Sequence, residues 1–369
     1  MVDNPGLESA LLTIRQGGQM ARGKALVAGA LGIVGSNVAE YLHSQGGWEV
    51  VGIARSRPKH QPGWRLVGLD LADATACRKF VASEPGITHL FYAARAPKPQ
   101  PADEAAANLA MLVNLMEPLQ EFAPGFQHAC LVHGTKWYGA HLGPFRTPAK
   151  EDDARHLPPN FYYDQADYVE GLQKGKSWTW SAVRPALVCG FSLGYPHSVV
   201  AVLAVYAAIS NALGLPLRFP GTQAGFDGVT QATDVRLLAR AMVWTATEPQ
   251  CANQHLNVMN GDLFRWRNLW DRLARHFGME NGGVQTVTLA TMMADKEPLW
   301  RSIVEKHGLR PLALSDIVNW NYADVTFRQN WDHISSTLKA RRLGLDATVD
   351  TEEMFLELLE RFREERVVP

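Results

Sequence analysis

The stretch GALGIVG at residues 29–35 decides the fold. It follows a short apolar run at 25–28 and opens a segment with helical spacing at 34–44, so it is typical of a turn from a first strand into a first helix. Glycines in such a turn let the backbone approach a pyrophosphate, and the helix N-terminus offers free N–H groups and a positive dipole. The stretch predicts a dinucleotide-binding loop, with a glycine-rich turn that binds nothing as the alternative. The residues expected at the cofactor are Gly29, Leu31, Gly32, Ile33, Val34 and Gly35.

Further short apolar runs follow the first one, separated by segments with helical spacing. They lie at 48–53, 65–71, 89–93, 129–133 and 178–183. Nearly continuous apolar strands that alternate with helices are typical of a parallel sheet covered on both faces. We therefore predict an α/β protein with a Rossmann-type, doubly wound parallel sheet.

The sequence pattern changes after Pro185, where the alternation of short apolar runs and helical segments ends. Residues 198–213 predict a long apolar helix, and tryptophans become frequent from residue 266 onward. These features indicate a smaller, mostly helical C-terminal lobe, as in extended short-chain reductases. We expect a flexible extension at 1–22, a dinucleotide-binding Rossmann domain at 23–190, and a substrate-binding lobe at 191–369 from which segments at about 225–260 return to the Rossmann core.

Charge and composition exclude several classes of partner. The 369 residues carry 36 basic and 37 acidic side chains, and a net charge of −1 gives no field that would attract nucleic acid or anionic lipid. The four cysteines show no metal-binding spacing and are expected to be reduced thiols. No apolar stretch reaches about 18 residues, and the start of the chain lacks a signal-peptide pattern. We expect a cytoplasmic enzyme that binds a small molecule, for which a homodimer is a reasonable assembly.

The end of the second predicted strand favours NADPH over NADH. NAD sites place an acidic residue there to bind the ribose 2′-hydroxyl, whereas this chain has Arg55, Ser56 and Arg57. A guanidinium is a planar fork that pairs with a 2′-phosphate. The alternative is that both arginines are solvated surface charges.

Three other strand ends, and the backbone that follows the last of them, complete the predicted cofactor site. Asp70 and Leu71 end the third run, where they are expected to flank the adenine; a simple turn acid is the alternative for Asp70. Ala93 ends the fourth run. Pro185 fixes φ and removes an N–H below the nicotinamide, and the backbone near Val188 is a candidate for the carboxamide. An ordinary strand exit is the alternative there.

The usual catalytic pair of short-chain reductases is absent. In that arrangement a tyrosine and a lysine lie four residues apart on one helix, and the lysine supplies positive charge to the phenol. None of Tyr162, Tyr163 and Tyr168 is followed by a lysine at that spacing. A lysine does occur in GTKWYG directly after the fifth strand, where cofactor and substrate meet in such sheets. It is Lys136.

Several stretches together resemble one family. On them the chain is similar to the progesterone 5β-reductase and iridoid synthase (PRISE) group of atypical extended short-chain reductases, from about residue 24 to the end. The matching stretches are GTKWYG (134–139), GPF (143–145), NFYY (160–163), RPALVCGFS (184–192), LPLRFPG (215–221), NGDLFRWRNLW (260–270) and the terminal VVP.

The resemblance implies an NADPH-dependent ene-reductase that transfers hydride to the β-carbon of an α,β-unsaturated carbonyl compound, an enone or enal. It places the catalytic lysine at Lys136 and the catalytic tyrosine at Tyr162, the first tyrosine of NFYY. Tyr162 is expected to stabilise the enolate oxygen while Lys136 supplies positive potential. Tyr163 is then the structural member of the pair.

The chain departs from the family pattern near the substrate. Trp137 stands where relatives tend to have His, His133 where they tend to have Thr, and Arg146 where Glu is common. A bulky Trp137 changes the expected pocket, so the family's substrates are not carried over. We expect Trp137, Phe145 and Phe161 to line the pocket, with core packing as the alternative for the two phenylalanines.

Three other functions compete with ene reduction. The first is an NADPH-dependent carbonyl reductase or alcohol dehydrogenase of the extended short-chain class. The second is a non-catalytic NADP-binding protein, because fold does not imply chemistry. The third is a nucleotide-sugar epimerase or dehydratase, which usually keeps the tyrosine–lysine spacing that is missing here.

Overall fold

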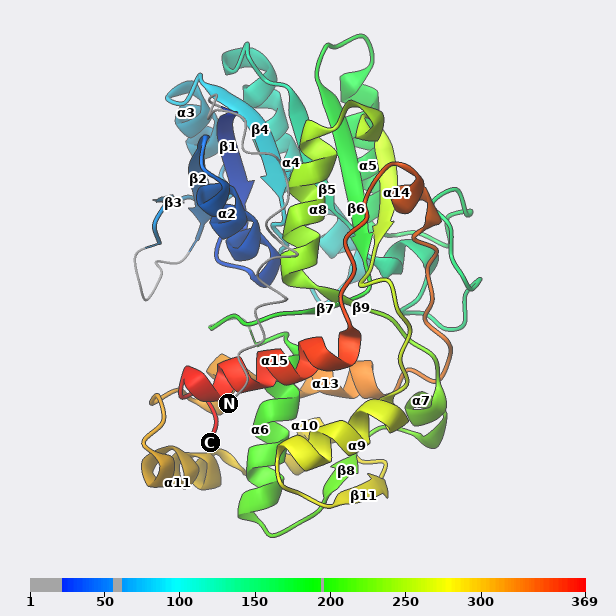
Figure 1. Ribbon diagram of the computed structural model, residues 1–369. Helices are drawn as coiled ribbons and strands as arrows, with labels where there is room; N and C mark the ends of the chain where they lie inside the picture. The colour runs from blue at the N-terminus through cyan, green and yellow to red at the C-terminus, as the bar shows by residue number, and fades with distance from the viewer. Residues whose placement is uncertain (1–21, 56–61, 194–195) are drawn as a thin grey trace.

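The computed structural model describes residues 22–55, 62–193 and 196–369. Within them, a parallel sheet of seven strands has the order β10-β6-β5-β4-β1-β2-β3 (Figure 1). The order reverses between β1 and β4, and the crevice at such a point is where ligands of open α/β sheets bind. The strands are β1 (Gly23–Ala28), β2 (Trp48–Ala54), β3 (Arg65–Gly68), β4 (Ile87–Tyr92), β5 (His128–Val132), β6 (Thr179–Pro185) and β10 (Gln254–Val258).

Helices cover both faces of the sheet, which confirms the predicted Rossmann-type fold. Ala25 and Val27 of β1 are buried in the same cluster as residues of α2 (Ile33–Gln45) and α8 (Val235–Thr247). Their neighbours Leu26 and Ala28 face the opposite cluster, on the side of α3 (Ala74–Ala82), α4 (Pro101–Phe122) and α5 (Phe161–Gln173). Successive side chains of a strand point to opposite faces, so a strand buried on both sides is apolar throughout.

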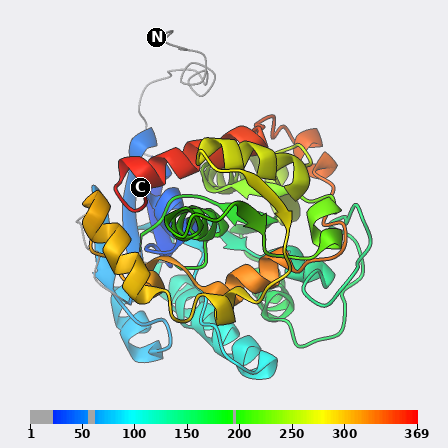
Figure 2. The same cartoon turned by 90° about the horizontal axis from the view of Figure 1, so that it is seen from below.

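The C-terminal lobe is built around one apolar helix, α6 (Val199–Ala212), which is buried along most of its length. Figure 2 shows α6 near the centre of the lobe, with α15 (Thr351–Glu364), α9 (Trp266–His276) and α11 (Glu297–His307) around it. Trp270 and Trp300 are fully buried, so these tryptophans belong to the core of the lobe. The remaining elements are η1 (Thr135–Tyr138), β7 (Leu187–Cys189), β8 (Leu217–Phe219), α7 (Gln223–Asp227), β9 (Ala232–Asp234), η2 (Pro249–Cys251), β11 (Asn281–Val284), α10 (Leu289–Met292), α12 (Leu314–Ile317), α13 (Trp320–Phe327) and α14 (Leu338–Arg342).

Residues 232–258 run from the lobe back to the sheet. Helix α8 packs against α2, and β10 pairs with β6 as an edge strand. The apolar runs did not predict β10 because polar residues interrupt it. His255 contacts Glu170 through Nε2 at 3.0 Å, and the Asn257 side chain accepts a hydrogen bond from Tyr138 Oη at 2.7 Å. An edge strand supports such residues because they find partners beside the sheet.

The four cysteines are buried and unbonded in the structure, as their spacing predicts. In the described ranges, we find no helix whose length and apolar character would suit a passage through a membrane. The predicted extension at 1–22 lies outside the described residues except for Arg22.

Candidate active site

The glycine loop between β1 and α2 is shaped by close backbone contacts. Gly29 has φ 79°, and a Cβ there would lie 2.8 Å from the carbonyl oxygen of Ala93. A Cβ on Gly35 would lie 2.2 Å from the oxygen of Gly29, so helix and loop meet there without room for a side chain. At Gly32 the same contact is 3.3 Å, and no side chain caps the helix. A Cβ at position 29 or 35 would therefore clash with the backbone, whereas a Cβ at position 32 would make only one tight contact.

The N-terminus of α2 is prepared for an anion. Gly32 is its N-cap, and the first turn holds no acidic residue. The first N–H groups of a helix have no partner within it, and they carry the positive end of the helix dipole. Ile33 is buried, whereas Leu31 and Val34 are partly exposed at the loop. The residues predicted for the pyrophosphate lie in this loop and the first turn of α2.

The strand ends on the adenine side are only partly described. Arg55 is exposed directly after β2, and within the described residues no ion pair engages it. Ser56 and Arg57 lie outside the described residues. Asp70 Oδ1 accepts from the Ala72 N–H at 3.0 Å, so this carboxylate stabilises a turn after β3, and Leu71 next to it is buried.

Tyr162 and Lys136 come from different elements to the C-terminal end of β5. Lys136 lies in η1, and Tyr162 is the second residue of α5. The Tyr162 Oη would be 3.3 Å from a Cβ built on Gly134, two residues before Lys136, and the Pro185 carbonyl oxygen would be 3.8 Å from the same point. The phenol, the lysine turn and the end of β6 therefore meet at one place. Ala93 ends the neighbouring β4, whereas Val188 pairs with Thr233 in the separate sheet of β7 and β9.

The surroundings of Lys136 weaken its proton affinity. Burial lowers the pKa of its ammonium, and the nearby Arg95 guanidinium lowers that pKa further, while Glu104 opposes the shift. Arg95 is itself paired with Glu104 at 2.7 Å. Neither residue was predicted from the sequence. The available signal was the position of Arg95, three residues after β4 and therefore at the carboxyl edge of the sheet.

The ring of His133 packs against the ring of Tyr162. His133 is 2% exposed, and the centroid of its ring lies 4.9 Å from that of Tyr162. Burial lowers the pKa of His133 well below the usual value, and the nearby His255 and Arg184 act in the same direction. The imidazole is therefore neutral, and it contributes ring packing rather than charge to the phenol.

The predicted pocket residues divide into two groups. Phe161 contacts Tyr162 directly, with ring centroids 4.4 Å apart, and the Arg95 guanidinium lies 5.8 Å from the Phe161 ring centroid. Phe145 instead stacks on Tyr138 at 6.5 Å, toward the C-terminal lobe. Of these two phenylalanines, Phe161 is the one whose ring contacts that of Tyr162.

Trp137, the third residue predicted for the pocket, is largely buried. Its side chain is 4% exposed, and the Arg184 guanidinium covers its ring at 3.7 Å from the centroid. Tyr163 meets the ring edge-on at 4.8 Å. The indole of Trp137 packs between these two side chains, because the buried Arg184 guanidinium is stabilised by lying on an aromatic face. Its ring also stacks on His133, with centroids 5.6 Å apart, and its place in the substrate pocket stays a prediction.

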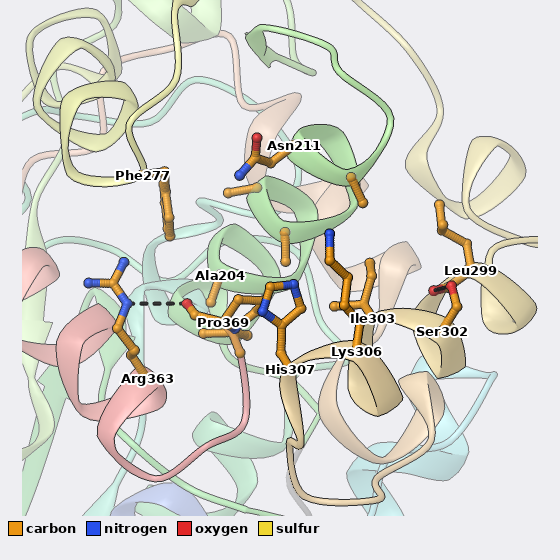
Figure 3. Close-up of a pocket in the computed structure, with 14 residues that line it drawn as sticks. Ala204, Asn211, Phe277, Leu299, Ser302, Ile303, Lys306, His307, Arg363 and Pro369 are labelled. Atoms are coloured by element: carbon orange, nitrogen blue, oxygen red, sulfur yellow. Dashed lines mark hydrogen bonds between the residues drawn. The ribbon is translucent and has the colours of Figure 1, made fainter.

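A separate cavity of about 670 Å³ lies in the C-terminal lobe. It is lined by α6, α11 and the C-terminus, and Figure 3 shows Lys306, His307 and Arg363 around it. Arg363 Nε donates to the Pro369 oxygen at 3.1 Å. The lining includes neither the glycine loop nor Lys136 or Tyr162, so this cavity is not part of the candidate active site.

Comparison with known proteins decides the family. The PRISE-like Rossmann-fold domain matches residues 70–369. The chain belongs to the PRISE-like family. A 3-oxo-Δ(4,5)-steroid 5-β-reductase of Arabidopsis thaliana is 33% identical over 94% of this chain and 93% of its own length. An (S)-8-oxocitronellyl enol synthase of Nepeta racemosa is also 33% identical, with the same coverage of both chains. The resemblance read from the sequence is thereby confirmed.

Solved structures agree on the fold of this PRISE-like chain. A UDP-glucose 4-epimerase of Thermotoga maritima superposes with a TM-score of 0.68 at 18% identity, covering 92% of this chain and 99% of that one. A short-chain dehydrogenase/reductase superfamily protein of Agrobacterium tumefaciens gives a TM-score of 0.65 at 15% identity, covering 93% and 98%. At such identities these matches show the fold and carry no argument about chemistry.

The site of this PRISE-like chain places the phenol of Tyr162 at the turn that bears Lys136, at the carboxyl edge of the sheet. Such a donor acts on an oxygen that becomes negative during a reaction. Within the described residues no cluster of histidine, cysteine and carboxylate side chains has the arrangement of a metal site. The arrangement suits reduction of a carbonyl-activated bond with a dinucleotide as the reductant.

Proposed function

We propose that the protein is an NADPH-dependent ene-reductase acting on enones or enals. The observation that carries the proposal is the approach of the Tyr162 Oη to Gly134, at the turn that bears Lys136 and at the carboxyl edge of the sheet. The family adds support, because the Arabidopsis relative is named for the 5β-reduction of a 3-oxo-Δ(4,5)-steroid.

The residues present fit a nicotinamide dinucleotide. Gly32 leaves open the space that a Cβ would fill at the N-terminus of α2, where backbone N–H groups suit a pyrophosphate. Arg55 at the end of β2, together with Arg57, is our basis for choosing the 2′-phosphate form. When bound, NADPH supplies the hydride. We assign Asp70, Leu71, Ala93, Pro185 and Val188 to the same cofactor site.

In the proposed mechanism, hydride reaches the β-carbon and the electron pair of the C=C bond moves toward the carbonyl oxygen. Tyr162 donates a hydrogen bond to that oxygen as it becomes an enolate. The Lys136 ammonium stabilises the same negative charge. It also strengthens the hydrogen bond that the Tyr162 hydroxyl donates. The α-carbon then takes a proton from water, which completes the saturated carbonyl product.

Product analysis tests the reaction class. The protein is incubated with NADPH and 2-cyclohexenone, and the products are separated by gas chromatography. We expect cyclohexanone. An allylic alcohol would instead establish the carbonyl reductase, and tight NADPH binding without turnover over a panel of enones would establish the non-catalytic alternative.

The pH dependence of turnover tests the role of Lys136. Because burial and then Arg95 lower its pKa, the ammonium loses its proton at a lower pH than an exposed lysine does. We therefore expect kcat to be full below this lowered pKa and to fall as the pH rises through it. Arg95→Met removes a repulsion and should move the alkaline limb to higher pH, whereas Glu104→Gln should move it to lower pH.

The matched control for these variants is Arg78→Met. Arg78 forms a comparable surface pair with Glu121 at 2.5 Å, away from the lysine turn. Its loss should leave the kcat–pH profile unchanged. If the kcat–pH profile is unchanged in both the Arg95 and the Glu104 variants, Lys136 does not have the proposed charge-stabilising role.

The same proposal includes the partner, the compartment, the oligomeric state and the domain division of the enzyme. Its partner is a small molecule rather than nucleic acid or a membrane, because a net charge of −1 attracts neither. We place it in the cytoplasm, as a homodimer, with the Rossmann domain at 23–190 and the substrate lobe at 191–369.

A further inference from the structure

One buried amide contacts both proposed catalytic segments. Asn160 is 8% exposed and is the N-cap of α5. Its Oδ1 accepts from the backbone N–H of Tyr162 at 3.0 Å, and its Nδ2 donates to the carbonyl oxygen of Lys136 at 2.9 Å. A single side chain therefore links the backbone of the phenol to the backbone of the ammonium.

A second link lies one residue beyond Tyr162. The Tyr163 Oη donates to the carbonyl oxygen of Trp137 at 2.5 Å and accepts from the His156 N–H at 3.1 Å. The edge-on contact with the Trp137 indole fixes the Tyr163 ring as well. Residues on both sides of Tyr162 thus hold two consecutive carbonyls, those of residues 136 and 137.

Apart from these links, Trp137 and Tyr138 of the lysine turn pack in one cluster with Tyr163 and Ala166 of α5, and His156 Nε2 lies 2.8 Å from the Lys136 carbonyl oxygen. The lysine turn is a short 3-10 helix, and its hydrogen bonds within the turn do not reach the helix that carries Tyr162. In short-chain reductases with the usual spacing, one helix sets the distance between tyrosine and lysine. Here that distance depends on contacts between two elements.

We propose that Asn160 and Tyr163 are positioning residues that set the separation of Tyr162 and Lys136 for ene reduction. They replace, through side-chain hydrogen bonds, the register that a shared helix would provide. The inference rests on the proposed function. A misplacement of about 1 Å in a catalytic constellation costs about 100-fold in rate, so the loss of either link should appear in kcat.

A purely structural role for Asn160 makes a different prediction. An N-cap is worth about 1 kcal/mol of stability, and serine caps a helix about as well as asparagine does. The shorter serine side chain keeps the cap to the Tyr162 N–H and loses the reach to the Lys136 carbonyl. The Asn160→Ser variant therefore separates capping from positioning.

The experiment compares Asn160→Ser and Tyr163→Phe with the unmodified protein in Tm, in NADP⁺ dissociation constant, and in kcat and KM for 2-cyclohexenone. We expect Asn160→Ser to keep its Tm and its NADP⁺ affinity while kcat falls about 10- to 100-fold. Tyr163→Phe should lose about 10-fold in kcat, with little change in KM. The control is Asp350→Ser, which alters the N-cap of α15 (Oδ1 to the Glu353 N–H, 2.9 Å) and should leave kcat unchanged.

The outcomes distinguish this inference from the proposed function. Unchanged kcat in both the Asn160→Ser and Tyr163→Phe variants, together with an inactive Tyr162→Phe variant, would overturn the positioning role and leave the ene-reductase intact. Should Asn160→Ser fail to fold, Tyr163→Phe decides alone, because it removes one oxygen and keeps the ring packing. A kcat loss that follows the loss of Tm in every variant would also overturn positioning.

Discussion

Replacing Tyr162 with phenylalanine should lower kcat for an enone about 100- to 1,000-fold while NADP⁺ binds as before. Removing one donor to a developing oxyanion costs about 2.7–4 kcal/mol of transition-state stabilisation. The phenyl ring keeps its packing on His133 and Phe161, whose centroids lie 4.9 and 4.4 Å from that of Tyr162. The lost oxygen therefore acts on the reaction far more than on the fold. Stopped-flow reduction rates and calorimetric NADP⁺ binding measure the two parts separately.

Tyr168→Phe is the matched control on the same helix. Its Oη donates to the exposed Glu117 side chain at 3.0 Å, on the surface of the Rossmann domain. That variant should keep its turnover within about twofold, as surface changes usually do. Normal kcat in the Tyr162→Phe variant would remove Tyr162 from the mechanism, whatever the product analysis shows.

The sheet was largely predictable because burial on both faces makes strands apolar. The runs at 25–28 and 48–53 became β1 and β2 almost residue for residue. Strand β10 was not predicted because it is an edge strand whose polar residues contact Tyr138 and Glu170 beside the sheet. Apolar periodicity detects buried apolar residues, and it misses a strand whose buried position is polar and hydrogen-bonded, as Asn257 is.

The site was predictable only where its residues carry a motif. Gly29, Lys136 and Tyr162 stand in recognisable stretches, and the structure brings the stretches of the last two together. Arg95, in the loop after β4, and Glu104, in α4, act on the lysine, and no local pattern reports a charge that acts across the fold. The packing of Trp137 was not predictable from the sequence for the same reason. Its neighbour Arg184 lies 47 positions later in the chain and covers its ring only after folding.

Gly32→Ala should weaken NADP⁺ binding without destabilising the unliganded protein. The residue has φ −75° and ψ 164°, which alanine adopts, and its Cβ would lie 3.3 Å from the Gly29 oxygen. The methyl group instead occupies the space through which a pyrophosphate approaches the α2 N-terminus. Overpacking of this kind costs about 1–3 kcal/mol, or about 5- to 150-fold in dissociation constant. Isothermal titration with NADP⁺ and a thermal melt of the unliganded protein give the two quantities.

Two other glycines make this result specific. Gly35→Ala should damage the unliganded fold itself, with a lower Tm, because its Cβ would lie 2.2 Å from a backbone oxygen that cannot move aside. Gly171→Ala lies in α5 with nothing within 4 Å of its Cβ, so it should stabilise the protein by about 0.4–1 kcal/mol and leave affinity unchanged. A glycine loop that binds no ligand predicts that Gly32→Ala behaves like Gly171→Ala. Equal NADP⁺ affinities in those two variants would therefore refute the pyrophosphate cradle.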